Sequence, residues 1–271
     1  MTFSHSLSQI PTEKQIAKEL KRIIYGKHVS CPDCGRKNTV VTLILNKKWR
    51  CKKCRIKFSI TSRTWLKGMK ISYTHLWALI WCWQKKINIQ QTHALLHLSI
   101  VTIRRYYELF RDNLQTDYEV LLEGQVQIDE MFVKHAFIIG GKDISMKKIK
   151  LQVKYYRHPH KDDAMNLMFH HVKPGSIVCT DGGSIYSACD KWWPITHRKE
   201  IHSKFQFCIT SEIEGIWANL RTFIRRMYHH VTLKKLTLIV REFEARFNHP
   251  EIFDFPLNYL KNSLSSVTLA L

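Results

Sequence analysis

The sequence lacks any apolar run of roughly 18 or more residues, which is the length that a membrane-spanning helix requires. The first fourteen residues lack the basic and then apolar order of a secretory signal. No internal repeat and no low-complexity linker interrupts the chain. These absences argue against a membrane protein, a secreted protein and a repeat array, and they predict an intracellular chain of two or three compact units in 271 residues.

Acidic residues are also scarce relative to basic ones. The chain has 43 Lys and Arg against 22 Asp and Glu, a formal net charge of +21 at pH 7, and the excess is spread along its whole length. Such a charge predicts a polyanionic partner, and nucleic acid is favoured over a lipid surface because no amphipathic anchor accompanies it. A solvated basic surface or a ribosome-associated protein is the alternative.

The eight cysteines do not suggest a disulfide framework, because four of them form two C-x2-C pairs, Cys31 with Cys34 and Cys51 with Cys54. This spacing is typical of two knuckles that hold one Zn²⁺ ion by four thiolates, with a small hairpin between them. A site closed by four cysteines has no open coordination position, so we expect a structural zinc. Basic residues around it would contact DNA phosphates, and a ribbon that binds another protein is the alternative.

A helical stretch follows the zinc ribbon. Tyr73 to Lys85 has the apolar pattern of a buried helix, and its tryptophans are expected in the core. Two shorter helical segments follow, from Ile89 to Leu98 and from Val101 to Arg111, with Arg104 and Arg105 near the start of the second. This order matches a helix-turn-helix, whose second helix enters the major groove of DNA, although a plain helical hairpin fits the same pattern.

Three carboxylates stand out in the remainder of the chain. Asp129 lies within the apolar strand pattern Gln125 to Val133, where a carboxylate is out of place unless it binds something. Asp181 follows a second apolar strand directly, and Glu214 lies beside the apolar face of a helical pattern. Two aspartates on strands and a glutamate on a helix are the hard oxygen ligands that two Mg²⁺ or Mn²⁺ ions would need.

The third ligand is the least certain of the three from sequence, because Glu212 is two residues from Glu214 and Glu130 is next to Asp129. Singly, Asp129 could be a hydrogen-bonded strand residue, and Asp181 could form the turn before two glycines. The histidines His197, His202, His229 and His230 are expected to contact DNA or lie on the surface, with His202 near the site.

In this order the elements resemble the zinc-ribbon DDE transposases of bacterial insertion sequences, the ISXO-like group, to which the Merlin transposases are related. The matching segments are the two C-x2-C pairs, Val126-Gln-Ile-Asp-Glu130, Pro174 to Gly182 with Tyr186, His202-Ser203, Ile213-Glu-Gly-Ile-Trp217 with Arg221, and Glu242 to Asn248. They span about residues 25 to 250 in the family's order.

The resemblance implies an α/β fold: an RNase H-like mixed sheet flanked by helices, preceded by a zinc ribbon and a helix-turn-helix-like domain. It places Asp129 on the first strand, Asp181 after the fourth and Glu214 on the next helix, and it implies cleavage at terminal inverted repeats and transfer of the 3′ ends into target DNA. Arg221 would contact DNA near the cut phosphate. We expect domains at 1–64 (an N-terminal segment with the zinc ribbon), 65–120 (helical, DNA-binding), 121–250 (catalytic) and 251–271 (a C-terminal tail). Within the tail, Lys261 to Leu271 is expected to be poorly ordered because of its serines and small apolar residues.

The chain departs from the family at one point that bears on catalysis. Where the family often has His-Thr-Asn, this chain has Ile209-Thr210-Ser211. A catalytically inactive or domesticated DNA-binding regulator is therefore the alternative to an active transposase, and an RNase H-like nuclease that cuts without joining is a third. The expected partners are double-stranded DNA and at least one more copy of the chain; the expected location is the bacterial cytoplasm with the nucleoid, or a eukaryotic nucleus.

Overall fold

The computed structural model describes residues 10–38, 40–43, 48–116, 119–133, 135–199, 210–228 and 231–268. The chain forms two compact units. The first unit comprises Met1–Gln115 and Glu251–Leu271, and the second comprises Thr116–Pro250. The second unit therefore interrupts the first in sequence.

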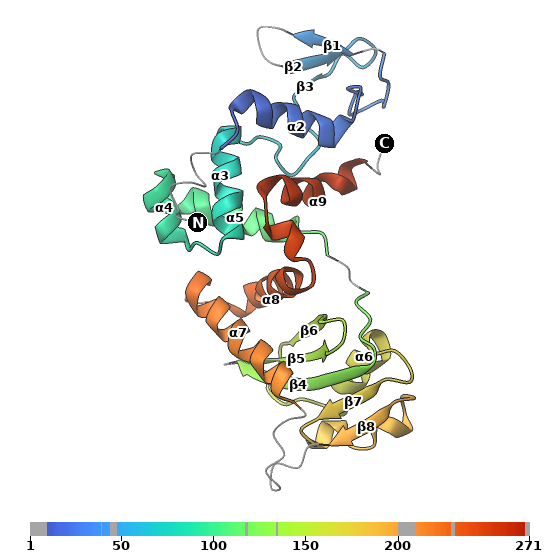
Figure 1. Cartoon of the computed structure of the whole chain (residues 1–271). Helices are drawn as coiled ribbons and strands as arrows, with labels where there is room; N and C mark the ends of the chain where they lie inside the picture. Colours follow the sequence, from blue (N-terminus) through green and yellow to red (C-terminus); the bar gives the residue numbers. More distant parts are fainter. Residues whose placement is uncertain are drawn as a thin grey trace. The chain divides into compact units, whose positions relative to one another are not determined.

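The first unit begins with helix α2 (Glu13–Tyr25) and a three-stranded antiparallel sheet. The strands are β1 (Val40–Leu43), β2 (Lys48–Cys51) and β3 (Lys57–Phe58), in that order across the sheet. The rings of Tyr25, Trp49 and Phe58 pack together, with centroids 5.7 to 6.5 Å apart. These rings join the sheet to α2, which lies beside the sheet in Figure 1.

The remainder of the first unit is helical: α3 (Tyr73–Gln84), α4 (Ile89–Leu96), α5 (Ile100–Asp112) and α9 (Pro256–Thr268). Trp83 of α3 is fully buried, and its ring lies 5.6 Å from Phe110 of α5 and 5.1 Å from Tyr259 of α9. Trp83 is therefore a core residue, as the helix pattern predicts. Residues 261–268, expected to be poorly ordered, instead belong to helix α9, in which Tyr259, Leu260 and Leu264 are buried.

The second unit contains a five-stranded mixed sheet in the order β6-β5-β4-β7-β8. Its strands are β4 (Gln125–Val133), β5 (Ala136–Asp143), β6 (Ile149–Lys154), β7 (Ile177–Thr180) and β8 (Thr196–Lys199). β4, β5 and β6 are antiparallel neighbours, whereas β7 and β8 run parallel to β4. Three antiparallel strands followed by two parallel ones, with the first strand in the centre, is the RNase H-like arrangement.

Helices cover both faces of this sheet. On one face, Val126 and Ile128 of β4 pack with Leu167 and Met168 of α6 (Lys161–His171) in a buried cluster. The other face carries α7 (Ser211–Tyr228) and α8 (Leu233–Asn248) (Figure 1). Because side chains alternate along a strand, Gln127 and Asp129 belong to the face that α7 covers.

Side chains of α8 cover the outer edge of the sheet, at β6. The side-chain amide of Asn248 accepts a hydrogen bond from the Ile149 N–H and donates one to the Ile149 carbonyl, each 2.9 Å. One helical turn earlier, Glu244 accepts from the Leu151 N–H at 2.7 Å. These bonds occupy edge groups that would otherwise be available to another strand. None of the described helices is both long and apolar enough to cross a membrane.

Candidate active site

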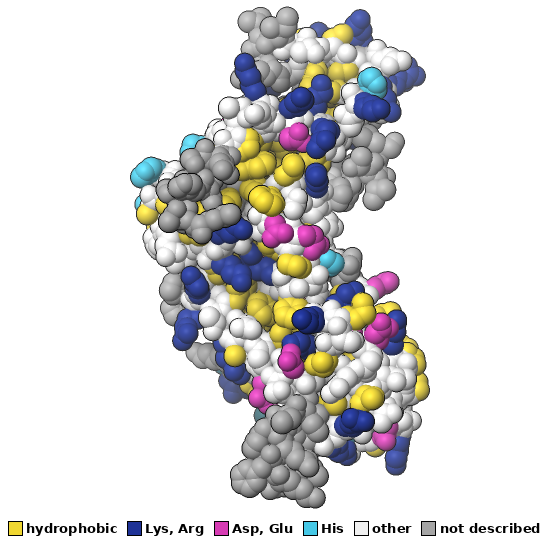
Figure 2. Space-filling view, in the orientation of Figure 1, with side chains coloured by type: hydrophobic (Ala, Val, Ile, Leu, Met, Phe, Trp, Pro, Cys, Tyr) yellow, Lys and Arg dark blue, Asp and Glu magenta, His cyan; other side chains and the backbone are white. Residues whose placement is uncertain are grey.

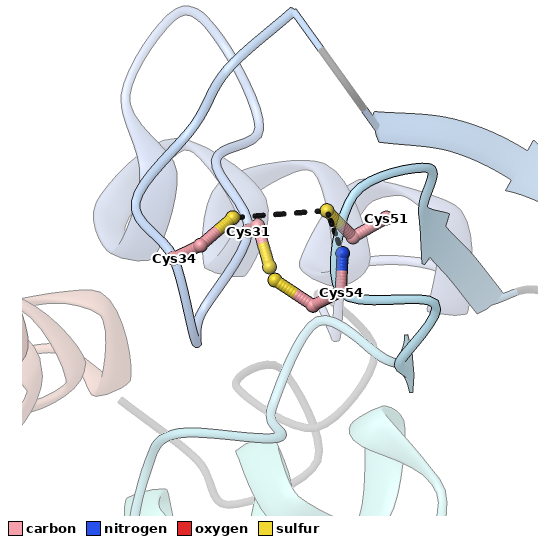
Figure 3. Close-up of side chains that lie close together, drawn as sticks. All are labelled: Cys31, Cys34, Cys51 and Cys54. Atoms are coloured by element: carbon pink, nitrogen blue, oxygen red, sulfur yellow. Dashed lines mark hydrogen bonds between the residues drawn. The ribbon is translucent and has the colours of Figure 1, made fainter.

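The four cysteines of the C-x2-C pairs converge on one point (Figure 3). Their sulfur atoms all lie within 4.8 Å of one another, and the sulfurs of Cys34 and Cys51 are 3.8 Å apart. A tetrahedral zinc with Zn–S bonds of about 2.3 Å requires sulfurs roughly 3.8 Å apart, so the cluster fits a Zn²⁺ ion. The predicted four-cysteine site is confirmed.

The two knuckles have the same backbone geometry. The first cysteine of each accepts at its carbonyl from the N–H four residues later, at 2.9 Å in both, from Gly35 in one knuckle and Arg55 in the other. Gly35 has φ +70° and Arg55 has φ +62°. The left-handed backbone after each C-x2-C turns the chain back and leaves both sulfurs on the inner side. Burial is the largest effect raising the pKa of Cys31, so a cation is needed to hold these thiols as thiolates.

The sheet brings Asp129 and Asp181 to the same place. β4 and β7 are parallel neighbours in a register that pairs Gln127 with Cys179. Two residues further along each strand, the same register places Asp181 level with Asp129, where β7 has just ended. Neighbouring strands lie about 4.8 Å apart, so the two aspartates lie side by side where β7 ends, a place that we call the carboxylate edge.

The turn that carries Asp181 is held by its own hydrogen bonds. Asp181 Oδ1 accepts from the Gly183 N–H at 2.8 Å, and Thr180 Oγ1 accepts from the Gly182 N–H at 3.2 Å. Thr180 Oγ1 is also 2.9 Å from Nε2 of His197 on β8. His197, expected on the surface or against DNA, is half-buried and supports this turn. Gly182 has φ +81°, which allows the chain to leave the strand sharply.

Helix α7 is docked onto the sheet face that carries Asp129. Gln127 Oε1 accepts from the Ile213 N–H at 2.9 Å, in the first turn of the helix. One turn later, the indole N–H of Trp217 donates to Asp129 Oδ2 at 2.9 Å. Glu214 lies between these two contacts in sequence and is exposed, and its charge is close enough to Asp129 to raise the pKa of that carboxyl group.

The structure separates Glu214 from its two competitors. Glu212 pairs with Lys142 of β5, which lowers the pKa of Glu212. Glu130 belongs to the opposite face of β4, where its Oε2 accepts from the Tyr186 hydroxyl at 2.6 Å. Of the three glutamates, only Glu214 has no such partner holding it away from Asp129; its Oε1 accepts a 3.3 Å bond from Thr210 within its own helical turn.

The electrostatics of the site reflect this crowding of carboxylates. Burial raises the pKa of Asp129, hydrogen bonds from the Glu130 backbone and from Trp217 lower it, and the charges of Asp181 and Glu214 raise it. Burial likewise raises the pKa of Glu130 to about 7. Like charges that oppose ionisation of one carboxyl group indicate a place where a cation would be favourable.

The carboxylates are nevertheless less tightly gathered than the cysteines. Within the part of the chain that the structure describes, only the four cysteines bring three or more Cys, His, Asp or Glu ligand atoms within 4.8 Å of one another. Ligands that share two ions about 3.5 to 4 Å apart need not all meet at one point. The arrangement is therefore an open carboxylate edge and not a closed cage.

The basic residues expected to bind DNA lie in both units. Arg104 and Arg105 are exposed on α5, which follows α4 after a three-residue turn, and Arg221 is exposed on α7 two turns after Glu214. His202, with His229 and His230, lies outside the described residues.

Two models of known families match the chain. Residues 11–57 match a transposase zinc-ribbon domain, and residues 121–248 match an ISXO2-like transposase domain. Together they account for well over half of the chain, in the order that the resemblance predicts. The chain belongs to the zinc-ribbon DDE transposases. The four-cysteine cluster of this transposase and its RNase H-like sheet agree with that assignment.

Solved structures similar to the transposase include retroviral integrases. A simian T-cell lymphotropic virus intasome, in complex with the PP2A regulatory subunit B56 gamma, is 12% identical over 60% of this chain and 69% of that one, with a TM-score of 0.37. The catalytic core domain of HTLV-2 integrase, in complex with magnesium, is 11% identical over 47% of this chain and 86% of that one, with a TM-score of 0.33. At these TM-scores, the fold assignment depends on the strand order. No curated protein matches the transposase in sequence.

Three features of the site were not predicted from the sequence. Trp217 was expected only on the apolar face of its helix, yet its N–H contacts Asp129. Gln127 was not singled out, although a polar residue two positions before Asp129 in an apolar strand shares its face and is a detectable signal. Gly140, the residue that pairs with Asp129 across β4 and β5, gives no sequence signal of its role.

Proposed function

We propose that the transposase binds the terminal inverted repeats of an insertion sequence, and that Asp129, Asp181 and Glu214 hold Mg²⁺ or Mn²⁺ for strand cleavage and strand transfer. The observation that carries the proposal is the carboxylate edge, where β7 ends beside Asp129 of β4. The parallel register of β4 and β7 supplies two aspartates there, and the docked helix α7 supplies the glutamate.

The donor set fits the proposed ions. Carboxylate oxygens are hard ligands suited to Mg²⁺ and Mn²⁺, and the open edge leaves room for water and a substrate phosphate. When bound, such ions lower the pKa of an attacking water or hydroxyl and stabilise the leaving oxygen. The residues of the transposase hold the ligands in place: Trp217 orients Asp129, and the Gly182-Gly183 turn orients Asp181.

The proposed reaction is two phosphoryl transfers at the same site. In cleavage, a water molecule loses a proton as its oxygen bonds to the phosphorus at the transposon end, the bond from phosphorus to the 3′ oxygen breaks, and the 3′ oxygen takes up a proton to give a 3′-hydroxyl opposite a 5′-phosphate. In strand transfer, the freed 3′-hydroxyl loses its proton as it bonds to a target phosphorus, and a target 3′ oxygen leaves. No net hydrolysis occurs in the second step.

The basic surface supports a DNA substrate. Figure 2 shows Lys and Arg side chains outnumbering Asp and Glu on the visible face. We propose that α5 reads the repeat through Arg104 and Arg105, that the zinc ribbon contacts phosphates, and that Arg221 contacts DNA near the cut. His202 is proposed as a further contact from the family resemblance alone. Pairing of two transposon ends would need at least two copies of the transposase.

The test is strand cleavage of duplexes copied from the DNA that flanks the reading frame. Zinc-loaded full-length wild type, D129N and D181N are compared for binding without Mg²⁺ and for cutting with it. We expect all three to bind alike, and both variants to lose cutting by at least about a thousandfold, because each removes a ligand of the reacting centre. Equal cutting by wild type and both variants would overturn the proposed site.

A catalytically inactive DNA-binding regulator is the second candidate. Ser211 stands where the family often has Asn, one helical turn from Glu214, and the carboxylate oxygens of the described residues do not all lie within 4.8 Å of one another. Specific binding of the flanking repeats by wild type, with no cutting in Mg²⁺ or Mn²⁺, would favour this candidate.

A further inference from the structure

The contact between Trp217 and Asp129 joins helix α7 to the central strand of the sheet. The indole N–H donates to Asp129 Oδ2 at 2.9 Å, and the Trp217 side chain is only 3% exposed. We infer that Trp217 is a positioning residue that fixes the Asp129 carboxylate for a divalent cation. This inference rests on the proposed function of the carboxylate edge.

The strand opposite Asp129 is shaped to admit the indole ring. Gly140 pairs with Asp129 across β4 and β5. A Cβ atom at Gly140 would lie 2.8 Å from Cη2 of Trp217 and 2.5 Å from a methyl of Leu151. Both distances are shorter than the contacts that Cβ atoms make in proteins. Any larger residue at position 140 would push the ring off the sheet and its N–H away from Asp129.

Helical spacing connects the same ring to the third carboxylate. Glu214 and Trp217 are three residues apart on α7, so they lie on the same side of the helix. When the indole binds Asp129, the turn that carries Glu214 is brought to the sheet as well. One hydrogen bond therefore constrains ligands on two separate elements.

The chemistry of an indole suits this role better than a charged donor would. Indole N–H is a donor only and carries no charge, so it orients the carboxylate without neutralising it. Lys or Arg in the same place would pair with Asp129 and compete with a metal ion. A carboxylate offers about four lone-pair sites, so one N–H bond leaves acceptor capacity for the cation.

The test measures Mn²⁺ binding directly, using the electron paramagnetic resonance signal of free Mn²⁺ in titrations of zinc-loaded full-length transposase. The variant is W217F, which keeps an aromatic ring and removes the donor. The matched control is W193F in the same unit, because the Trp193 N–H donates to the Val172 carbonyl at 3.1 Å, a bond that involves no carboxylate. Loss of a partner that orients a metal ligand costs about 10- to 100-fold in affinity, so W217F should weaken Mn²⁺ binding at least tenfold.

W193F should stay within about twofold of wild type, and unfolding temperatures recorded for both variants show whether each is folded. If W217F does not fold, Trp217 is replaced instead by 3-benzothienylalanine, which keeps the bicyclic shape and removes only the N–H. Weakened binding in that protein supports the inference equally.

A third variant, D129N, separates the two possible failures. If D129N loses Mn²⁺ binding but W217F binds as tightly as W193F, the role of Trp217 is overturned and the proposed carboxylate site stands. If D129N binds Mn²⁺ as wild type does, the proposed site is itself wrong, and the role inferred for Trp217 is overturned with it.

Discussion

The transposase has two sets of proposed metal ligands, and they are built in opposite ways. The four cysteines come from two short turns, and their sulfur atoms lie within 4.8 Å of one another. Asp129, Asp181 and Glu214 come from a strand, a turn and a helix, and they leave an open edge. A closed set of ligands holds a fold together, whereas an open set leaves coordination positions for substrate.

A related difference separates other polar residues of the second unit from the proposed carboxylate ligands. Three polar side chains of the second unit form hydrogen bonds within the fold: Asn248, Glu244 and Asp163. Like the cysteines, they stabilise the fold and leave no position for a substrate. Two acidic residues near the carboxylate edge are also held by partners: Glu212 pairs with Lys142, and Glu130 accepts from the Tyr186 hydroxyl. The comparison therefore predicts which substitutions unfold the transposase and which stop its chemistry.

The largest effect should come from opening the closed site. C34S should release the zinc and unfold the ribbon, because structural zinc sites contribute roughly 10 to 16 kcal/mol of binding free energy to folding. Zinc content per chain and circular dichroism measure this. C189A, which removes a buried cysteine of the second unit, should retain its zinc. Zinc loss in both variants would show that zinc content reports general unfolding.

The next effect should separate the two glutamates of α7. E214Q should lower strand cleavage at least about a hundredfold at unchanged unfolding temperature, because it removes the charge of a proposed ligand. E212Q should lose only the pair between the exposed Glu212 and the buried Lys142 and cut within about threefold of wild type. Cleavage rates at saturating Mg²⁺ measure both. The reverse ranking would assign the third ligand to Glu212.

A smaller effect on stability is expected at the covered edge of the sheet. N248A removes both hydrogen bonds to Ile149 and leaves backbone groups of β6 unsatisfied, which should cost about 1 to 3 kcal/mol and several degrees of unfolding temperature. N166A, an exposed residue of α6, should leave the unfolding temperature unchanged. If N248A unfolds at the wild-type temperature, the hydrogen bonds to β6 do not stabilise this edge.

The smallest effect concerns acid stability. Burial alone would raise the pKa of Asp163, but hydrogen bonds from Tyr156, from the His160 backbone and from Lys154 lower it on balance. A carboxyl group whose pKa is lowered by folding stabilises the folded state at pH values above its ordinary pKa, which is 3.8 for Asp163. That stabilisation is lost as the pH falls through the lower pKa of the folded state. Unfolding temperature should therefore fall less steeply below about pH 4 in D163N than in wild type. Equal slopes would show that Asp163 contributes nothing to acid stability.

Much of the closed site could be predicted from the sequence because its ligands are local. The spacing of each C-x2-C pair predicts a tight turn that places both sulfurs on one side, and Gly35 permits the turn that follows the first pair. Asp129 and Asp181 could be singled out as carboxylates in or after apolar strands. Their proximity follows from the parallel pairing of β4 and β7, which joins residues about fifty positions apart and has no local signal.

The remaining features depend on packing between elements. Neither the choice of Glu214 over Glu212 nor the donor role of Trp217 can be read from helical spacing, because both depend on how α7 meets the sheet. Residues 261–271, which include the second half of α9, were expected to be poorly ordered because of their serines and small apolar residues. This helix is ordered because Tyr259 and Leu264 are buried against distant parts of the first unit.

The most direct test of two metal sites with separate roles is a Mg²⁺ titration of the zinc-loaded transposase on duplexes carrying the flanking repeats, with binding and cutting measured in the same samples. We predict that the transposase binds the duplexes fully at every Mg²⁺ concentration and that strand cleavage rises from zero as Mg²⁺ is added. Cutting without any added divalent ion, after trace metals other than the bound zinc are removed, would contradict an open carboxylate site that depends on added metal.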